Sequence, residues 1–427
     1  MRCTVLAIGT RGDVQPLLTL AAGLRAAGVN VVCATHADFA DAARALGLTT
    51  KIVLGDSAPF FGGAVGVAMR DRAGNPEALR RFLDNYLPLA YEKLLGALTE
   101  AGRDTDAVIA WPFGRGLTSL AEAFRIPVIV ACPYPPPHLP STLFPSPFAP
   151  AADYPDERSI RRSWRRSFPV LQMNHAAVNR WRAKALGLGP IVWRDDLRRL
   201  RRLPHLLGYS SAVVPRPADW APWINVTGYW FDRSTSSYAP PPELSAFLDR
   251  GPAPVVIGFS SQVDRDPARL TRTVVEGVTE AGVRAVIVTG FGGLTPGSLP
   301  EQVLAIPTVP YPWLFSRSSA VVHHGGSGSL AAALQAGLPN MAVPFGFDQL
   351  FWGGRAHALG VGPAPLPAST LTSSSLAQAL RILTTNMAMQ QRARKIGEQI
   401  RSEDGLGRAV SAVIATLEQH RSHPAAS

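Results

Sequence analysis

The chain has 427 residues, of which 46% are hydrophobic and 8% aromatic. This length and apolar content exclude a disordered protein and leave room for two α/β domains, each with its own core. The formal net charge is +11, but no nucleic-acid recognition motif accompanies it, so we expect no nucleic-acid partner.

The first half of the chain alternates short apolar runs with amphipathic stretches. The runs that predict buried strands are residues 4–8, 29–35, 107–110 and 127–131. Residues 14–27 and 38–46 have helical patterns and lie between them. Such alternation is typical of a doubly wound parallel sheet.

The cysteines and the N-terminus indicate the compartment. Cys3, Cys33 and Cys132 are odd in number and match no metal-ligand spacing, which argues against a disulfide framework and a metal site. The N-terminus lacks the long apolar region of a signal peptide, and no run reaches the ~18 apolar residues of a membrane span. We therefore expect a cytoplasmic protein.

A proline-rich segment, residues 133–150, directly follows the last of these strands. Ligands of open α/β sheets bind beyond the carboxyl ends of the strands, so this segment is well placed to line a pocket. The alternative is that it packs as ordinary surface.

Much of the positive charge lies in two arginine clusters. Their members are Arg161, Arg162, Arg165, Arg166, Arg194, Arg198, Arg199, Arg201 and Arg202. The simpler interpretation is a solvated helix face. Attraction to a phosphorylated donor, or a weak association with anionic membrane, is the alternative.

A second unit with the same alternation begins after residue 250. Its predicted strands are residues 255–259, 284–289, 303–306, 320–323 and 341–343. Residues 213–242 are rich in proline, which favours a stiff linker. We predict a first Rossmann-like domain at residues 1–212, this linker, and a second Rossmann-like domain at residues 243–405.

Residues 323–329 read HHGGSGS and lie between a predicted strand and a predicted helix. Glycines at such a turn let the backbone approach a ligand, and the free N–H groups of the following helix suit a diphosphate. Residues 344–349, PFGFDQ, follow the next strand and place a carboxylate beside an amide. Paired sugar hydroxyls need that mixture of acceptors and donors, although an ordinary turn would also use these residues.

Together these segments resemble the donor signature of GT-B fold glycosyltransferases, and most closely that of sterol 3-beta-glucosyltransferases and bacterial enzymes that glycosylate antibiotics and other natural products. Residues 9–16 (GTRGDVQP) resemble the first loop of that group, and residues 226–230 (VTGYW) its inter-domain stretch. The resemblance implies two domains facing each other across a cleft. It also implies that residues 406–427 form a C-terminal helix that packs back on the first domain.

The resemblance implies a donor site with three parts. The diphosphate contacts would be Ser261, His324, Gly326, Gly328 and Ser329, the sugar contacts Asp348 and Gln349, and the base contacts Val309 and Trp313. Ser260 and Gln262 depart from the glycine and methionine usual in the family, which leaves the choice between UDP and dTDP open.

Asp13 is the candidate catalytic base, because it lies in the loop after the first strand, where plant relatives place a catalytic histidine. Partial burial would raise its pKa and make it a better base. The alternative is that Asp13 caps the helix that begins near Val14. His138 and His175 are weaker candidates, since such histidines are usually satisfied polar residues.

The sequence thus predicts an inverting, metal-independent hexosyltransferase that uses UDP-glucose as co-substrate, needs no cofactor and forms a β-glycoside. The acceptor would be a lipophilic sterol, polyketide or macrocycle. The residues expected to line its pocket are Tyr134, His138, Leu143, Phe144 and His175. The alternatives are a non-catalytic partner of another glycosyltransferase, a nucleotide-sugar epimerase, and a nucleic-acid or membrane-binding protein.

Overall fold

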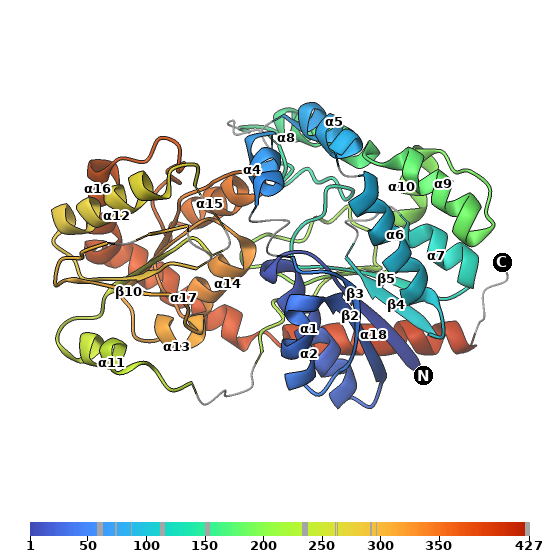
Figure 1. The fold of residues 1–427 in the computed structure, drawn as a ribbon, viewed down its shortest axis with the longest axis horizontal. Coiled ribbons are helices and arrows are strands. Elements are labelled where there is room, and N and C mark those ends of the chain that lie inside the picture. Colours follow the sequence, from blue (N-terminus) through green and yellow to red (C-terminus); the bar gives the residue numbers. More distant parts are fainter. Residues whose placement is uncertain are drawn as a thin grey trace.

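The fold was examined in a computed structural model of the chain (Figure 1). The structure describes residues 1–57, 63–72, 75–86, 88–111, 116–149, 154–232, 238–260, 262, 264–290, 293–295 and 297–422.

The N-terminal half is built on a seven-stranded sheet in the order β3-β2-β1-β4-β5-β6-β7, and every recorded pairing is parallel. The strands are β1 (Arg2–Ala7), β2 (Asn30–His36), β3 (Thr49–Leu54), β4 (Ala107–Ala110), β5 (Val128–Cys132), β6 (His205–Leu207) and β7 (Ile224–Val226). All residues of β4 and β5 are buried, as expected for strands covered on both faces.

Helices cover both faces of this sheet. They are α1 (Arg11–Ala26), η1 (Ala37–Phe39), α2 (Ala40–Ala45), α4 (Ala64–Arg72), α5 (Pro76–Tyr86), α6 (Pro88–Gly102), α7 (Leu117–Phe124), α8 (Glu157–Arg166), η2 (Phe168–Gln172), α9 (His175–Leu186) and α10 (Trp193–Leu200). Leucines of α1 belong to the core on one face, and leucines of α6 and α7 belong to the core on the other.

The C-terminal half repeats this plan with a five-stranded parallel sheet in the order β10-β9-β8-β11-β12. Its strands are β8 (Val255–Gly258), β9 (Ala285–Val288), β10 (Val303–Ile306), β11 (Ala320–His323) and β12 (Asn340–Ala342). Its helices are α11 (Pro242–Asp249), α12 (Pro267–Ala281), α13 (Tyr311–Phe315), α14 (Ser327–Gln335), α15 (Gln349–Ala358), α16 (Ser373–Thr385) and α17 (Met387–Ser402). The prediction of two doubly wound α/β domains is confirmed.

The segment expected to be a linker, residues 213–242, is not all linker. Ile224–Val226 forms β7 and pairs with β6, so the first sheet continues into it. Val213, Val214 and Trp220 are buried in the N-terminal core. The proline content of the segment masked a strand of only three residues.

The last helix, α18 (Gly405–Ser422), runs beside α1 of the N-terminal domain (Figure 1). Leu406 and Val410 contact Gly23 of α1 so closely that a side chain there would have to displace them. Near the start of α18, the Ser210 hydroxyl donates to Glu403 at 2.6 Å. Glu403 and α18 therefore connect the C-terminal domain to the N-terminal domain.

Candidate active site at the domain interface

The loop after β1 positions Asp13. Gly9 has φ +130°, and a Cβ at this position would lie 2.6 Å from the Asp13 carboxylate, so only glycine fits. The carboxylate Oδ2 accepts the Thr10 N–H at 2.8 Å and the Thr10 hydroxyl at 2.9 Å. Helix α1 begins at Arg11, earlier than expected, and its N-cap is Thr10. Asp13 is therefore not the N-cap that the alternative interpretation predicted, but the third residue of the helix, whose carboxylate completes a capping box with Thr10. Its second oxygen, Oδ1, has no recorded hydrogen bond to any residue that the structure describes.

Burial raises the pKa of Asp13 to about 6, and the two hydrogen bonds from Thr10 offset only part of that shift. Such a carboxyl is ionised near neutral pH and is a stronger base than an ordinary aspartate. Capping the helix and accepting a proton are compatible roles, because they use different oxygens.

In the C-terminal domain, the side chain of buried His323 fixes the turn between β11 and α14 by hydrogen bonds. Its Nδ1 accepts the Gly325 N–H at 2.9 Å, and its Nε2 lies 3.2 Å from the Asn340 side-chain oxygen. Gly325 has φ +90°, and a Cβ there would lie 2.6 Å from the Gln349 carbonyl. The turn is thus packed against the start of α15.

His324 follows in the same turn, and its imidazole ring is neutral and able to bind a ligand. Burial, and secondarily the charge of His323, lower the pKa of His324 to about 3, so the ring is neutral at physiological pH. Its Nδ1 is buried and has no hydrogen-bond partner among the described residues. A buried ring nitrogen of this kind is costly unless a ligand satisfies it.

Helix α14 begins beside His324, with Gly326 at its N-cap and no side chain capping its first N–H groups. Ser329 is buried and is hydrogen-bonded to Tyr311 at the start of α13, and Gly328 is exposed. Free backbone N–H groups at a helix start suit an anion. The turn brings His324, Gly326, Gly328 and Ser329 together; Ser261 lies outside the described residues.

The turn between β12 and α15 carries Asp348 and Gln349. The Oε1 of Gln349 accepts the Phe345 N–H at 2.6 Å and the Gly346 N–H at 3.3 Å, so the amide NH₂ is the part left to donate to a ligand. Asp348 Oδ2 accepts the indole N–H of buried Trp352 at 2.8 Å.

The two domains bring Asp348 towards Asp13. Burial raises the pKa of Asp348 to about 6, and the charge of Asp13 adds to that shift. Nearby, burial raises the pKa of Tyr311 in the C-terminal domain, and the charge of Arg11 from the start of α1 offsets part of that shift. Phe144 and Phe351 also meet across the interface, with ring centroids 6.0 Å apart. The start of α1 therefore faces the starts of α14 and α15.

The residues expected to hold the base lie after β10. Val309 is buried, and its backbone makes no recorded hydrogen bond within the described part of the chain. The Trp313 ring is packed by Tyr238, with centroids 5.2 Å apart, and by the Arg317 guanidinium, 4.3 Å from its centroid.

The expected acceptor residues fall into two groups. Tyr134 and Phe144 are buried near the interface, and burial together with the charges of Asp13, Cys132 and Asp348 raises the pKa of Tyr134. Leu143 is 53% exposed.

The two histidines have other partners. The His138 and His205 rings meet at 2.8 Å between their Nε2 atoms, and His175 Nε2 lies 2.8 Å from the Ile191 carbonyl. No recorded contact joins either histidine to Asp13 among the described residues.

Sequence reasoning missed three contributors to this interface. Trp352 donates a hydrogen bond to Asp348 and follows it by four residues. Side chains at this spacing lie on the same face of a helix, so the sequence could have indicated the contact. The Trp111 indole donates to Cys132 Sγ at 2.6 Å beneath Tyr134, and Phe347 packs on α4 and α5. The last two contacts join segments far apart in the sequence, so no local signal marks them.

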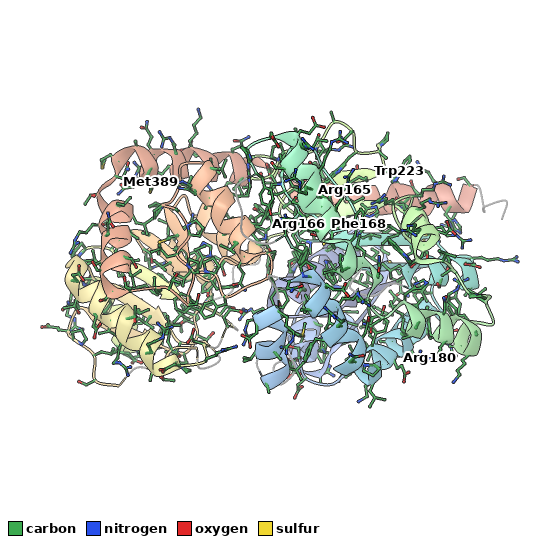
Figure 2. The ribbon with its side chains drawn as sticks, turned by 90° about the horizontal axis from the view of Figure 1, so that it is seen from above. Arg165, Arg166, Phe168, Arg180, Trp223 and Met389 are labelled. Atoms are coloured by element: carbon green, nitrogen blue, oxygen red, sulfur yellow. The ribbon has the colours of Figure 1, made fainter. Side chains whose placement is uncertain are left out.

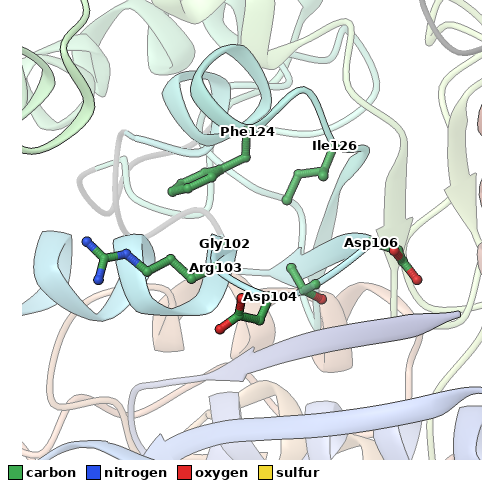
Figure 3. Close-up of a pocket in the computed structure, with 7 residues that line it drawn as sticks. Gly102, Arg103, Asp104, Asp106, Phe124 and Ile126 are labelled. Atoms are coloured by element: carbon green, nitrogen blue, oxygen red, sulfur yellow. The ribbon is translucent and has the colours of Figure 1, made fainter.

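A separate surface depression lies at the opposite edge of the N-terminal sheet (Figure 3). Arg103, Asp104, Asp106 and Phe124 line it, and Asp106 accepts the Arg2 N–H at the start of β1. Asp13 follows the carboxyl end of β1, so this depression is not part of the candidate site.

Two family models match the chain. Residues 3–136 match the glycosyltransferase family 28 N-terminal domain, and residues 284–415 match the erythromycin biosynthesis protein CIII-like C-terminal domain. These ranges contain Asp13 and every described donor-site residue named above.

Curated relatives match nearly the whole chain. A sterol 3-beta-glucosyltransferase of Aspergillus terreus is 36% identical over 98% of this chain, which spans 30% of that protein. One of Arabidopsis thaliana is 34% identical over 98% of this chain, which spans 66% of it. The chain therefore covers less than a third of the fungal relative's length and about two thirds of the plant relative's.

Solved structures share the fold. The kitacinnamycin glycosyltransferase superposes with a TM-score of 0.70 at 21% identity, covering 97% of this chain and 99% of that one. The calicheamicin glycosyltransferase CalG4 superposes with a TM-score of 0.67 at 21% identity, covering 98% and 99%.

Proposed function

The chain belongs to the glycosyltransferases of the GT-B fold, and we propose that it transfers a hexose, glucose from UDP-glucose, to a hydroxyl of a lipophilic acceptor. The observation that supports this proposal is that Asp13 lies close enough to Asp348 for their charges to interact across the domain interface. Beside it, Arg11 interacts with Tyr311, which is hydrogen-bonded to Ser329 of α14. A base thereby faces a cradle suited to a nucleotide diphosphate sugar.

The donor would be held by the C-terminal domain. The diphosphate would accept hydrogen bonds from the first N–H groups of α14, from neutral His324 and from the hydroxyls of Ser329 and Ser261. Asp348 and the Gln349 NH₂ would bind the sugar hydroxyls, and the Val309 backbone and Trp313 would bind the base. These groups supply the electrostatics for the leaving diphosphate, so the proposed reaction needs no metal or other cofactor.

The proposed chemistry is a single displacement at the anomeric carbon. Asp13 Oδ1 accepts the proton of the acceptor hydroxyl while the hydroxyl oxygen forms its bond to that carbon. The bond from the carbon to the β-phosphate oxygen breaks on the opposite face, and its electron pair leaves with UDP. Inversion converts the α-linked donor sugar into a β-glycoside. Water is disfavoured as a nucleophile where Tyr134 and Phe144 keep the interface apolar.

A sterol is the acceptor class that we propose first, because the curated relatives named above are sterol 3-beta-glucosyltransferases. A rigid polyketide or macrocycle is the second, since the similar solved structures are named for natural-product glycosylation. Both classes suit a pocket with few polar groups.

The test is a transfer assay that combines UDP-glucose and dTDP-glucose with cholesterol, ergosterol and a set of macrolactones, with product mass as the readout. We expect an acceptor-plus-hexose product with UDP-glucose and a sterol. Binding of UDP-glucose without transfer to any acceptor would favour a non-catalytic partner protein instead. Acceptor-independent conversion of the donor to free sugar products would favour an epimerase.

Weak association with anionic membrane would bring the enzyme to a lipophilic acceptor. Helix α8 presents Arg158, Arg161, Arg162, Arg165 and Arg166 to solvent, and Figure 2 shows Arg165 and Arg166 near Phe168 in the view from above. Exposed arginines attract the anionic headgroups of a bilayer. No helix among the described residues is long and apolar enough to cross a membrane. Sedimentation with phosphatidylserine vesicles, against phosphatidylcholine vesicles, tests the association.

A further inference from the structure

Phe347 directly precedes the candidate sugar-binding residue Asp348 and has an unusual backbone conformation. Its φ is +55°, in the left-handed region that bulky L-residues rarely occupy. Such a conformation persists only where surrounding contacts fix it, and it is often found at functional sites. The contacts that fix Phe347 are therefore informative.

The Phe347 side chain reaches across to the N-terminal domain. It packs against an apolar cluster whose buried members are Met69 on α4 and Leu79, Phe82 and Leu83 on α5. Val65 and Ala68 of α4, Val170 of η2 and Met173 pack against the same cluster. Among the residues that the structure describes, Phe347 is the member of this cluster from the C-terminal domain. Figure 1 shows α4 next to α15, the helix that begins just after Phe347.

A second contact between the same regions is weaker. Arg265, in the loop before α12, forms an ion pair with Asp71 of α4 at 2.5 Å, and the Arg265 side chain is 72% exposed. Exposed ion pairs contribute little to stability. The apolar contact of Phe347 is therefore the stronger link between α4 and the donor domain.

We propose that Phe347 is a positioning residue that couples closure of α4 and α5 to the orientation of Asp348. With these helices packed on its ring, the backbone of Phe347 is fixed and Asp348 is held towards Asp13. With the helices apart, the ring loses its partners and the turn relaxes to a less strained conformation. Asp348 would then hold the donor sugar in a reactive position only when the acceptor domain is closed. This inference rests on the proposed function.

Three variants separate the side chain from the backbone. Phe347→Gly removes the ring but tolerates the positive φ, so it imposes no new backbone conflict. Phe347→Leu keeps an apolar side chain for the cluster. Arg265→Ala is the matched control, since it removes the ion pair between α4 and the donor domain without touching the Asp348 turn.

The first readout is calorimetric binding of UDP and of UDP-glucose, without acceptor. We expect Phe347→Gly to bind UDP within about twofold of wild type, because the α14 turn is intact, and to lose most of the added affinity for UDP-glucose. The second readout is transfer to cholesterol, where kcat should fall at least about tenfold, since small misplacements are costly at a reacting centre. Phe347→Leu should keep most of the added affinity for UDP-glucose and most of kcat. Arg265→Ala should stay within about twofold of wild type in both the affinity and kcat.

Two results would overturn the proposal. One is a Phe347→Gly protein with the wild-type preference for UDP-glucose over UDP and the wild-type kcat. The other is a parallel loss of UDP and UDP-glucose binding with a lowered Tm, which would indicate a general structural role. If wild type binds UDP-glucose but transfers to no acceptor, the proposed function fails, and the two binding affinities still test Phe347 by themselves.

Discussion

The two sides of the domain interface are built in different ways. On the C-terminal side, the polar groups lie on two short turns, residues 323–329 and 344–349, each between a strand and a helix of the same sheet. On the N-terminal side, Asp13 meets that site from the first turn of α1, and the apolar surroundings come from separate segments around Tyr134, Phe144 and α4 with α5. Chemistry that depends on backbone geometry can be local, whereas an apolar pocket has to be assembled from distant parts of the chain.

That difference explains what the sequence could predict. The donor turns were located because glycines, a strand and a helix start follow one another within a few residues. Strands β4, β10 and β11 have the predicted bounds; β4 and β11 are buried along their whole length, and β10 is buried at its first and last residues.

The remaining features depend on tertiary contacts. Strand β3 has no buried residue and therefore lacks the apolar run that would mark it. Strands β6 and β7 have three residues each, too few for a periodic signal. His138 resembles a pocket residue in sequence, but only the fold shows that it pairs with His205.

The largest expected effect comes from Asp13, the candidate base on the acceptor side. Asp13→Asn should lower transfer by about 10²–10⁴-fold, because the proton acceptor is lost. UDP-glucose binding should stay within about twofold, since the donor contacts lie on the other domain. Kinetics and calorimetry on the same preparation check both. Retained turnover would assign the base to another residue.

On the donor side, we expect substitution of His324 to change the affinity for UDP. His324→Ala should weaken UDP binding about tenfold, because it removes a neutral donor from a buried anion site. Since burial lowers the pKa of His324 to about 3, the histidine contributes no titration to UDP binding between pH 5 and pH 8. His324→Gln, which stays neutral and can still donate, is the control. A steep pH dependence that disappears in His324→Gln would contradict a neutral ring.

Substitution of Trp352 should have a smaller effect, seen mainly in the KM for UDP-glucose. Trp352→Phe keeps the aromatic core of α15 but removes the hydrogen bond to Asp348. We expect the KM for UDP-glucose to rise about threefold to tenfold with a smaller change in kcat, because one bond that orients the carboxylate is lost. An unchanged KM would show that Asp348 is oriented without the indole.

The last expected effect is on stability rather than on binding or catalysis, and it depends on pH. The pKa of Asp348 is raised to about 6, so between about pH 4 and pH 6 the unfolded state loses its proton first and the native state becomes less stable as pH rises. Asp348→Asn should therefore raise the free energy of unfolding at pH 7.5 by about 1–2 kcal/mol. The gain should vanish near pH 4, which urea unfolding at both pH values can check. An equal gain at both values would mean that the charge is not its cause.

The central claim is that an acceptor hydroxyl, deprotonated by Asp13, attacks a donor sugar held by the opposite domain. The most direct test is the anomeric configuration of the product that wild type forms from UDP-α-glucose and cholesterol, read by proton NMR. A β-glucoside, absent from the Asp13→Asn reaction, is the predicted result. An α-glucoside, or the same β-glucoside formed at the wild-type rate without the Asp13 carboxylate, would contradict the account.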